Sequence, residues 1–232
     1  MDSVHIQPSM SVTDRNSPSA SSPLPPTARS TYRHGDLRRA LLDAGIELAR
    51  QGGPDAVVLR EATRRAGVAP NAAYRHFANR QDLLAAVRAA AVAAVAQAME
   101  AEMADVPTGG TPTEQAHARV RAVGAGYMRF AHAETGLFRT AFGGQFSVEQ
   151  DPDPAMGGLT GLNPFEHLSA ALDDLVTAGA LPPERRQGAE YLAWSTVHGM
   201  ALLSIDGPLR GTPAEMMQLL GQRLLDMVER GI

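Results

Sequence analysis

The 232-residue sequence contains no cysteine. This absence excludes disulfide bonds, zinc–thiolate sites, iron–sulfur clusters and thiol nucleophiles. A chain without cysteine fits the reducing cytoplasm, although it would suit any other compartment as well. Lysine is also missing, because all 21 basic residues are arginine. A phosphate-binding P-loop is therefore excluded, since that motif requires a lysine.

Aromatic residues and long apolar runs are scarce. The chain has 6 Phe, 4 Tyr and 1 Trp, and its longest uncharged candidate for a membrane span, 89–99, holds only 11 residues. A spanning helix needs ~20 apolar residues. No basic segment precedes an apolar stretch near the N-terminus, so we expect no signal peptide. Together with 44% hydrophobic residues, these features predict a soluble cytoplasmic protein that does not enter a membrane.

Sequence signatures of enzymes are missing too. Ser195 and His198 are close in sequence, but no G-x-S-x-G motif surrounds the serine. The seven histidines show no H-x-x-x-H spacing for a metal, and the glycines of 157–161 follow no predicted strand, as a dinucleotide fingerprint requires. We therefore expect neither enzymatic activity nor a cofactor nor a bound metal.

Charge is unevenly distributed along the chain. Residues 29–90 hold 11 Arg against 6 acidic residues, a net of +5, whereas 91–232 hold 9 Arg against 17 acidic residues, a net of −8. A basic segment beside an acidic body is typical of a DNA-binding module joined to a second domain.

The hydrophobic pattern predicts an all-α fold of about nine helices. Leu37, Leu41, Ala44 and Leu48 recur at helical spacing, and no segment alternates with period two. Residues 1–30, rich in Ser and Pro, are predicted to be a disordered tail, and the breaker-rich stretch 143–164 a long loop of open role. The expected helices run from 36 to a stop at Gly52-Gly53, then over 59–66, 70–77, 80–103, 113–132, 134–142, 165–178, 184–205 and 212–229.

The segment 59–84, LREATRRAGVAPNAAYRHFANRQDLL, has the pattern of a helix-turn-helix. Gly67 supplies the tight turn between two short helices, and the second helix of such a unit enters the DNA major groove. Its apolar members, which would dock it on the preceding helices, are Val68, Ala73 and Phe77. Its polar members, which would face DNA, are Asn71, Tyr74, Arg75 and His76.

These residue types suit DNA recognition. Asn pairs with adenine and Arg with guanine or phosphate, while a Tyr hydroxyl or a His ring nitrogen donates to phosphate oxygens. An arginine at 64 or 65 fits a solvated helix face as well as a phosphate contact. The predicted DNA-binding residues are Arg33, Arg64, Pro70, Asn71, Ala72, Tyr74, Arg75, His76 and Arg80.

Residues 32–85 resemble the DNA-binding domain of TetR-family transcriptional regulators. The resemblance rests on the entry segment 32–42, the turn Arg-Arg-Ala-Gly-Val at 64–68, the Tyr-Arg-His-Phe at 74–77 and the spacing to Leu83-Leu84. The segment Trp-Ser-Thr-Val-His-Gly at 194–199 also resembles the Trp…His-Gly signature of one type of C-terminal domain in this family. The resemblance implies a homodimer formed largely by the last two helices, a palindromic operator, and repression that a small apolar or amphipathic effector relieves. Activation or corepression are the alternative modes.

Two positions depart from the family pattern. Ala69 stands where a capping Ser or Thr is common, and Thr63 stands where a small apolar residue is usual. A missing cap typically costs ~1 kcal/mol. These departures keep open a second hypothesis, a helical ligand-binding or sequestering protein with a degenerate helix-turn-helix.

The C-terminal part supplies candidates for an effector site and a dimer interface. The predicted domains are 31–80 for DNA binding and 81–232 for ligand binding and dimerisation. Aromatic side chains and a histidine suit an adaptable apolar pocket, and they suit an ordinary core equally well: Tyr127, Phe130, Phe138, Phe142, Trp194 and His198. Apolar residues at helical spacing near the C-terminus are the predicted dimer contacts: Leu202, Met217, Leu220, Leu224 and Met227.

Overall fold

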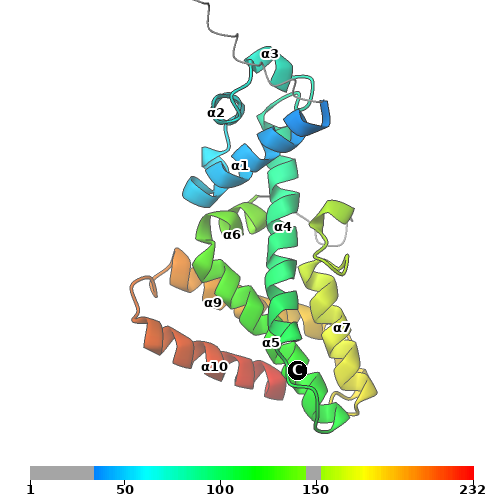
Figure 1. Ribbon diagram of the computed structural model, residues 1–232. Coiled ribbons are helices and arrows are strands. Elements are labelled where there is room, and N and C mark those ends of the chain that lie inside the picture. The colour runs from blue at the N-terminus through cyan, green and yellow to red at the C-terminus, as the bar shows by residue number, and fades with distance from the viewer. Residues whose placement is uncertain (1–33, 145–152) are drawn as a thin grey trace, which may run out of the picture. The chain divides into compact units, whose positions relative to one another are not determined.

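The computed structural model describes residues 34–144 and 153–232. These ranges contain ten α-helices and one short 3-10 helix and no strand (Figure 1). The predicted all-α fold is confirmed, with one helix more than expected. The predicted tail 1–30 and the candidate Arg33 lie outside the described residues, as does part of the 143–164 loop.

The three N-terminal helices are α1 (His34–Ala56), α2 (Leu59–Arg65) and α3 (Pro70–Ala73). The expected stop at Gly52-Gly53 is a kink inside α1, where Gly53 adopts a φ of 69° that other residues rarely tolerate. Gly67, with φ 67°, turns the chain between α2 and α3. These glycines allow three short segments to fold back on one another.

The predicted recognition helix 70–77 is shorter than expected. Tyr74 is already the C-cap of α3, and turns carry the chain from there toward Phe77. The N-cap Ala69 has no side chain that could accept a hydrogen bond from the first turn, so this helix lacks the stabilisation that a cap provides.

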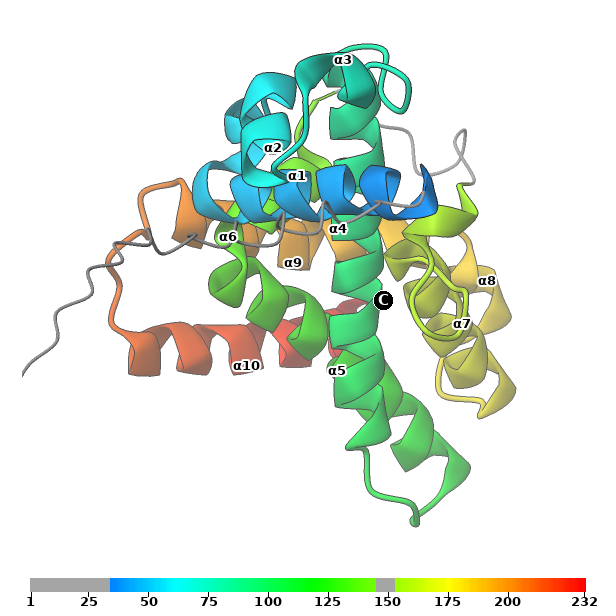
Figure 2. The same ribbon diagram turned by 45° about the horizontal axis from the view of Figure 1, so that its top comes forward.

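The central helix α4 (Arg80–Ala104) contacts α1, α5, α6 and α7. Figure 2 shows α1 crossing α4 next to α6. By length and composition α4 could span a membrane, because an 18-residue window in it carries at most 2 charged residues. The expectation that residues 89–99 were the longest candidate for a membrane span was therefore too narrow. Since 56% of that window is buried inside the protein, α4 acts here as a core helix.

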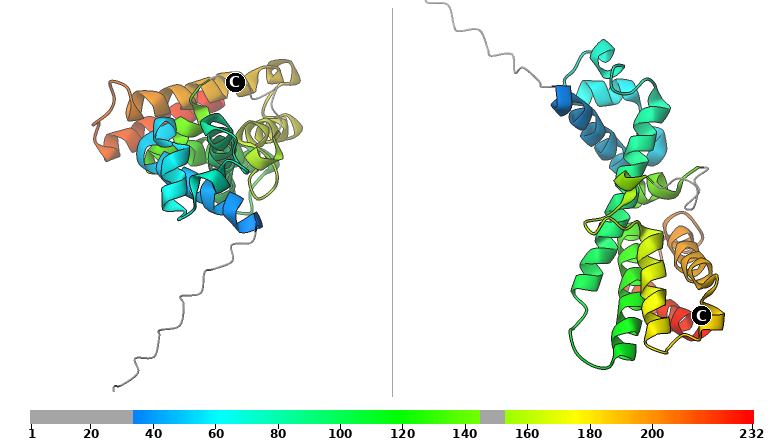
Figure 3. Two further views of the ribbon diagram at one scale, coloured as in Figure 1. Left: turned by 90° about the horizontal axis from the view of Figure 1, so that it is seen from above. Right: turned by 90° about the vertical axis from the view of Figure 1, so that its right-hand side faces the viewer.

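The remaining helices build the C-terminal bundle, in which α4, α5 and α7 run side by side (Figure 3). A single helix over 184–205 was wrong: Gly188, with φ 79°, separates α8 from α9. The loop before α7 contains the 3-10 helix η1. The elements are α5 (Pro112–Ala133), α6 (Thr135–Phe142), η1 (Pro154–Met156), α7 (Pro164–Thr177), α8 (Pro183–Arg186), α9 (Ala189–Ile205) and α10 (Ala214–Gly231).

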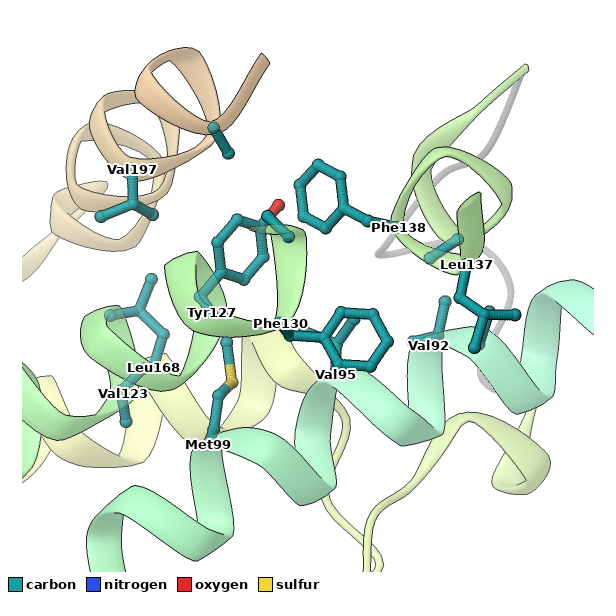
Figure 4. Close-up of a cluster of buried hydrophobic side chains, with 14 of the residues drawn as sticks. Val92, Val95, Met99, Val123, Tyr127, Phe130, Leu137, Phe138, Leu168 and Val197 are labelled. Atoms are coloured by element: carbon teal, nitrogen blue, oxygen red, sulfur yellow. The ribbon is translucent and has the colours of Figure 1, made fainter. Parts of the chain in front are cut away.

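The core of this bundle is formed by side chains from five helices. Figure 4 shows Met99 of α4, Tyr127 of α5, Phe138 of α6, Leu168 of α7 and Val197 of α9 converging. Tyr127 and Phe138 are fully buried and meet edge to face, with ring centroids 5.3 Å apart. Burial of large aromatic rings in this geometry contributes strongly to stability.

Candidate DNA-binding surface and effector cavity

The surface of α3 and its following turn carries the polar residues predicted to face DNA. Asn71 and Arg75 are exposed, the Tyr74 side chain is 57% exposed, and His76 is partly buried. Ala73 and Phe77 are buried, and the guanidinium of Arg38 in α1 lies 5.2 Å from the Phe77 ring centroid. The buried members fix this segment on α1 and α2, and the polar members are left free for a partner.

The other predicted DNA-binding residues have different surroundings. Pro70 is exposed at the first turn of α3, and Ala72 is partly buried. Arg64 donates two hydrogen bonds to Glu61, at 2.9 and 2.6 Å. This pairing, aided by Arg65, lowers the pKa of Glu61 to about 2. Arg64 therefore lies on a solvated helix face with a carboxylate partner of its own.

Arg80 has a structural role that the sequence did not indicate. Its Nε donates to the carbonyl oxygen of Val57 at 2.8 Å, and its Nη2 donates to that of Pro54 at 2.7 Å. These bonds hold the end of α1 and the following turn against the start of α4. The guanidinium is thus already engaged with backbone carbonyls at the end of α1.

The C-terminal bundle encloses a cavity of about 50 Å³. Of the six predicted pocket residues, Tyr127, Phe142 and Trp194 line it. Phe130 and Phe138 are core residues that do not reach the cavity. His198 instead borders a neighbouring opening together with Phe142 and Trp194.

Several lining residues were not predicted from the sequence, among them Arg121, Met156, Asn163 and Glu229. Arg121 and Glu229 are more than one hundred positions apart in the chain and are joined by hydrogen bonds of 3.1 Å. The only available signal was the apolar spacing of their neighbours on α5 and α10, and that spacing does not identify a partner.

A chain of hydrogen bonds connects the aromatic residues beside the cavity. The Trp194 indole N–H donates to the Tyr127 hydroxyl at 3.2 Å, and that hydroxyl lies 2.7 Å from His198 Nδ1. Burial raises the pKa of Tyr127 and lowers the pKa of His198. The geometry is therefore that of a protonated tyrosine donating to a neutral histidine.

The lowered pKa of His198 predicts a loss of stability in mild acid. Because the native state disfavours the imidazolium, its contribution is fully present above the unmodified pKa of 6.5 and is lost as the pH falls below it. We expect the wild-type free energy of unfolding to decline by up to about 1.4 kcal/mol per pH unit more steeply there than that of His198→Asn, measured by urea denaturation between pH 7.5 and 5.5. Identical slopes for wild type and His198→Asn would contradict the assignment.

A buried acid–histidine pair fastens the loop that carries η1 to α4. The Glu100 carboxylate accepts hydrogen bonds from the backbone N–H groups of Leu159 and Thr160, both at 2.8 Å, and from His167 Nε2 at 3.2 Å. Burial alone would raise the pKa of Glu100, but the hydrogen bonds from Thr160 and Leu159 outweigh it and lower this pKa. These bonds hold the segment that follows the cavity-lining Met156, and η1 itself also packs on α4.

Helix α6 contacts both α1 and the wall of the cavity. At one end Gly136 packs so closely on α1 that a Cβ would overlap the carbonyl oxygens of Ala49 and Arg50. Arg50 also donates to Glu134, just before α6, at 2.8 Å. At the other end Phe142 lines the cavity and lies 5.5 Å from the Tyr127 ring. Helix α6 therefore connects the wall of the cavity with α1.

Helices α9 and α10 expose apolar side chains. Among the predicted dimer contacts Leu202 and Met227 are exposed, and Met217 and Leu220 are partly buried. Leu224, also a predicted dimer contact, is only 9% exposed and packs in the hydrophobic core of the chain. Exposed apolar neighbours that the sequence did not single out include Leu192, Leu203, Met216 and Leu219.

Comparison with protein-family models gives two matches. Residues 41–87 match the model for bacterial regulatory proteins of the tetR family, and residues 120–228 match a tetracyclin repressor-like C-terminal domain. No match is found among curated proteins.

Solved structures share the fold over most of the chain. A protein of unknown function from Rhodococcus sp. RHA1 is 26% identical, with 88% of this chain and 99% of that one covered and a TM-score of 0.69. FadR from Bacillus subtilis, solved in complex with stearoyl-CoA, is 16% identical (84% and 98% covered, TM-score 0.57). PfmR from Thermus thermophilus is 20% identical (83% and 98% covered, TM-score 0.51). The chain is a member of the TetR family of DNA-binding transcriptional regulators, a non-enzymatic family.

Proposed function

We propose that this regulator is a ligand-responsive, homodimeric repressor that acts in the cytoplasm on a palindromic operator. The observation that carries the proposal is the position of α6, which touches the cavity wall through Phe142 and supports α1 through Gly136. A ligand that prefers one arrangement of this wall would shift the population of DNA-binding conformations by its difference in affinity for them.

The α3 surface is the proposed contact with DNA. Asn71 and Arg75 would reach base edges in the major groove, and Tyr74 and His76 would donate to phosphates. Pro70 and Ala72 have small side chains, which would let the backbone of α3 approach the DNA closely. The exposed Arg64 adds a cation near the DNA backbone that Glu61 already partly neutralises. In this proposal 31–80 form the DNA-binding domain and 81–232 the effector and dimerisation domain.

Two such surfaces in one dimer would read two half-sites one helical turn apart. The exposed apolar residues of α9 and α10 are the proposed interface, because large apolar patches on a soluble protein mark association sites. An interface of this kind places the same residues of both subunits in contact.

Charged substitutions in this interface are expected to give monomers. Leu203→Asp, on the exposed face of α9, would bury an unpaired carboxylate between subunits, and operator affinity should fall at least about tenfold because only one half-site is then held. Sedimentation velocity measures the oligomeric state. Leu159→Asp is the matched control, since Leu159 is 85% exposed on a loop outside these helices. A Leu203→Asp protein that sediments like wild type would contradict the proposed interface.

The proposal as a whole is tested by fluorescence anisotropy on DNA from upstream of the protein's own gene, across a salt series. Competitor-resistant binding with a steep salt dependence is expected for an operator-binding regulator. Binding that a ligand strengthens would identify a corepressor mode instead. Weak binding, equal on all DNA and unchanged by ligands, would contradict the proposal and favour a sequestering protein with a degenerate helix-turn-helix.

A further inference from the structure

We infer that the cavity takes an uncharged, apolar ligand and rejects carboxylates, ammonium ions and acyl-CoA-type anions. This inference rests on the proposed function of the cavity as the effector site and concerns the chemistry of its ligand. It follows from the partners of the charged groups that the lining presents and from its apolar walls.

Arg121 is the one cationic side chain among the described residues that line the cavity, and each of its three guanidinium nitrogens donates to a side chain of α10. Its Nε and Nη2 each lie 3.1 Å from an oxygen of Glu229, and Nη2 also donates to Asp226. Its Nη1 donates to Gln222 at 3.3 Å. Two carboxylates therefore neutralise this arginine, so an incoming anion would have to displace them.

Glu229 is the one acidic side chain in the same described lining, and it is engaged in turn. Both of its carboxylate oxygens accept from Arg121. A cationic ligand would have to compete with an arginine bound through two parallel hydrogen bonds, which is among the stronger pairings in proteins.

Neutral polar groups of the lining also have partners within the protein. The Tyr127 hydroxyl is shared between Trp194 and His198. The Asn163 side-chain oxygen accepts from the backbone N–H groups of Phe165 and Glu166, at 2.9 and 3.0 Å, where it caps α7. The Tyr127 hydroxyl and the Asn163 side-chain oxygen thus already have partners, and neither carries a charge with which a ligand ion could pair.

The rest of the lining is hydrocarbon or aromatic, contributed by residues such as Val123, Phe142, Phe165, Val197 and Leu225. A charged head group enclosed by such walls loses its hydration without gaining a partner, which is strongly unfavourable. The present volume of about 50 Å³ is also far below the ~300–1,000 Å³ of typical ligand sites. An apolar ligand can widen the cavity by displacing flexible side chains such as Met156, because it has no polar partners to align.

Trp194 provides a direct test, because it is the single tryptophan of the chain and lines the cavity. Titrations of its fluorescence compare octanol, octanoate and octylammonium, which share a chain length and differ in head group. Octanol is expected to bind at least about tenfold more tightly than either ion. Equal or tighter binding of octanoate or octylammonium, or no response to octanol, would overturn the inference.

Releasing Arg121 should weaken this selectivity. In an Asp226→Asn/Glu229→Gln variant the guanidinium loses both carboxylates, so the ratio of octanoate to octanol affinity should rise at least about tenfold. Asp174→Asn is the control, because it removes the carboxylate that pairs at 2.7 Å with Arg119, which does not line the cavity, and the ratio should stay at the wild-type value. An unchanged ratio in the double variant would also overturn the inference.

Operator binding without ligand is measured on the same preparations. If the wild-type protein shows no specific binding to the operator, the proposed function is contradicted. An inverted head-group preference in a protein that still binds its operator would overturn only the ligand chemistry.

Discussion

The Tyr74→Ala/His76→Ala double variant is expected to bind operator DNA at least about tenfold more weakly than wild type. The structure leaves the Tyr74 side chain largely exposed on the turn after α3, with His76 beside it. Hydrogen bonds to a charged phosphate contribute more than neutral ones, about 1.5–3 kcal/mol each. Since phosphate contacts carry no sequence information, the loss should be similar on operator and on unrelated DNA.

Two single substitutions on the same α3 surface distinguish base contacts from phosphate contacts. Asn71→Ala or Arg75→Ala should cost about 1–3 kcal/mol on the operator and also narrow the difference between operator and unrelated DNA. Arg210→Ala, an exposed arginine in the turn between α9 and α10, is the control. Competition anisotropy measures the DNA affinity of these four variants and of the wild type. Wild-type affinity in the Tyr74/His76 double variant would contradict the docking of α3 on DNA.

Gly136→Ala is expected to lower the free energy of unfolding by about 2 kcal/mol or more. A Cβ at this position would overlap the Ala49 and Arg50 carbonyl oxygens of α1. Because backbone atoms cannot rotate away as a flexible side chain can, either α6 or α1 must shift. Overpacking of this kind typically costs 1–3 kcal/mol. Urea denaturation measures the change.

The matched substitution is Gly231→Ala at the end of α10, where an added Cβ meets nothing within 4 Å. It should leave stability unchanged or raise it slightly, since alanine favours helix more than glycine does. If Gly136→Ala were as stable as Gly231→Ala, the close packing of α6 on α1 would not hold in solution. The proposed route from cavity to DNA-binding helices would then lose its support.

The helix-turn-helix could be recognised because its information is local. Gly67, Ala73 and Phe77 lie within eleven positions of one another, and their spacing alone specifies a turn and the buried side of a short helix. The length of that helix was harder to predict. Its cap is missing at Ala69, and cap strength weighs heavily in a segment of four residues.

Positions defined by distant neighbours were predicted less well. Arg80 has the composition of a phosphate contact, but the fold places the Val57 and Pro54 carbonyls against it. Leu224 continues an apolar stripe on α10, and the stripe does not say whether its own subunit or a partner covers it. Phe130 and Phe138 are aromatic residues near the cavity, but other core side chains take the positions around it.

The sequence by itself determined the all-helical architecture, the helix-turn-helix and the position of its polar face, because helical periodicity and turn residues act over a few neighbouring positions. Only the tertiary structure decided which aromatic residues enclose the cavity, and that Arg121 of α5 is neutralised by Asp226 and Glu229 of α10. Periodicity identifies the buried side of a helix but not what packs against it. The ligand chemistry of the cavity therefore follows from contacts between residues more than one hundred positions apart.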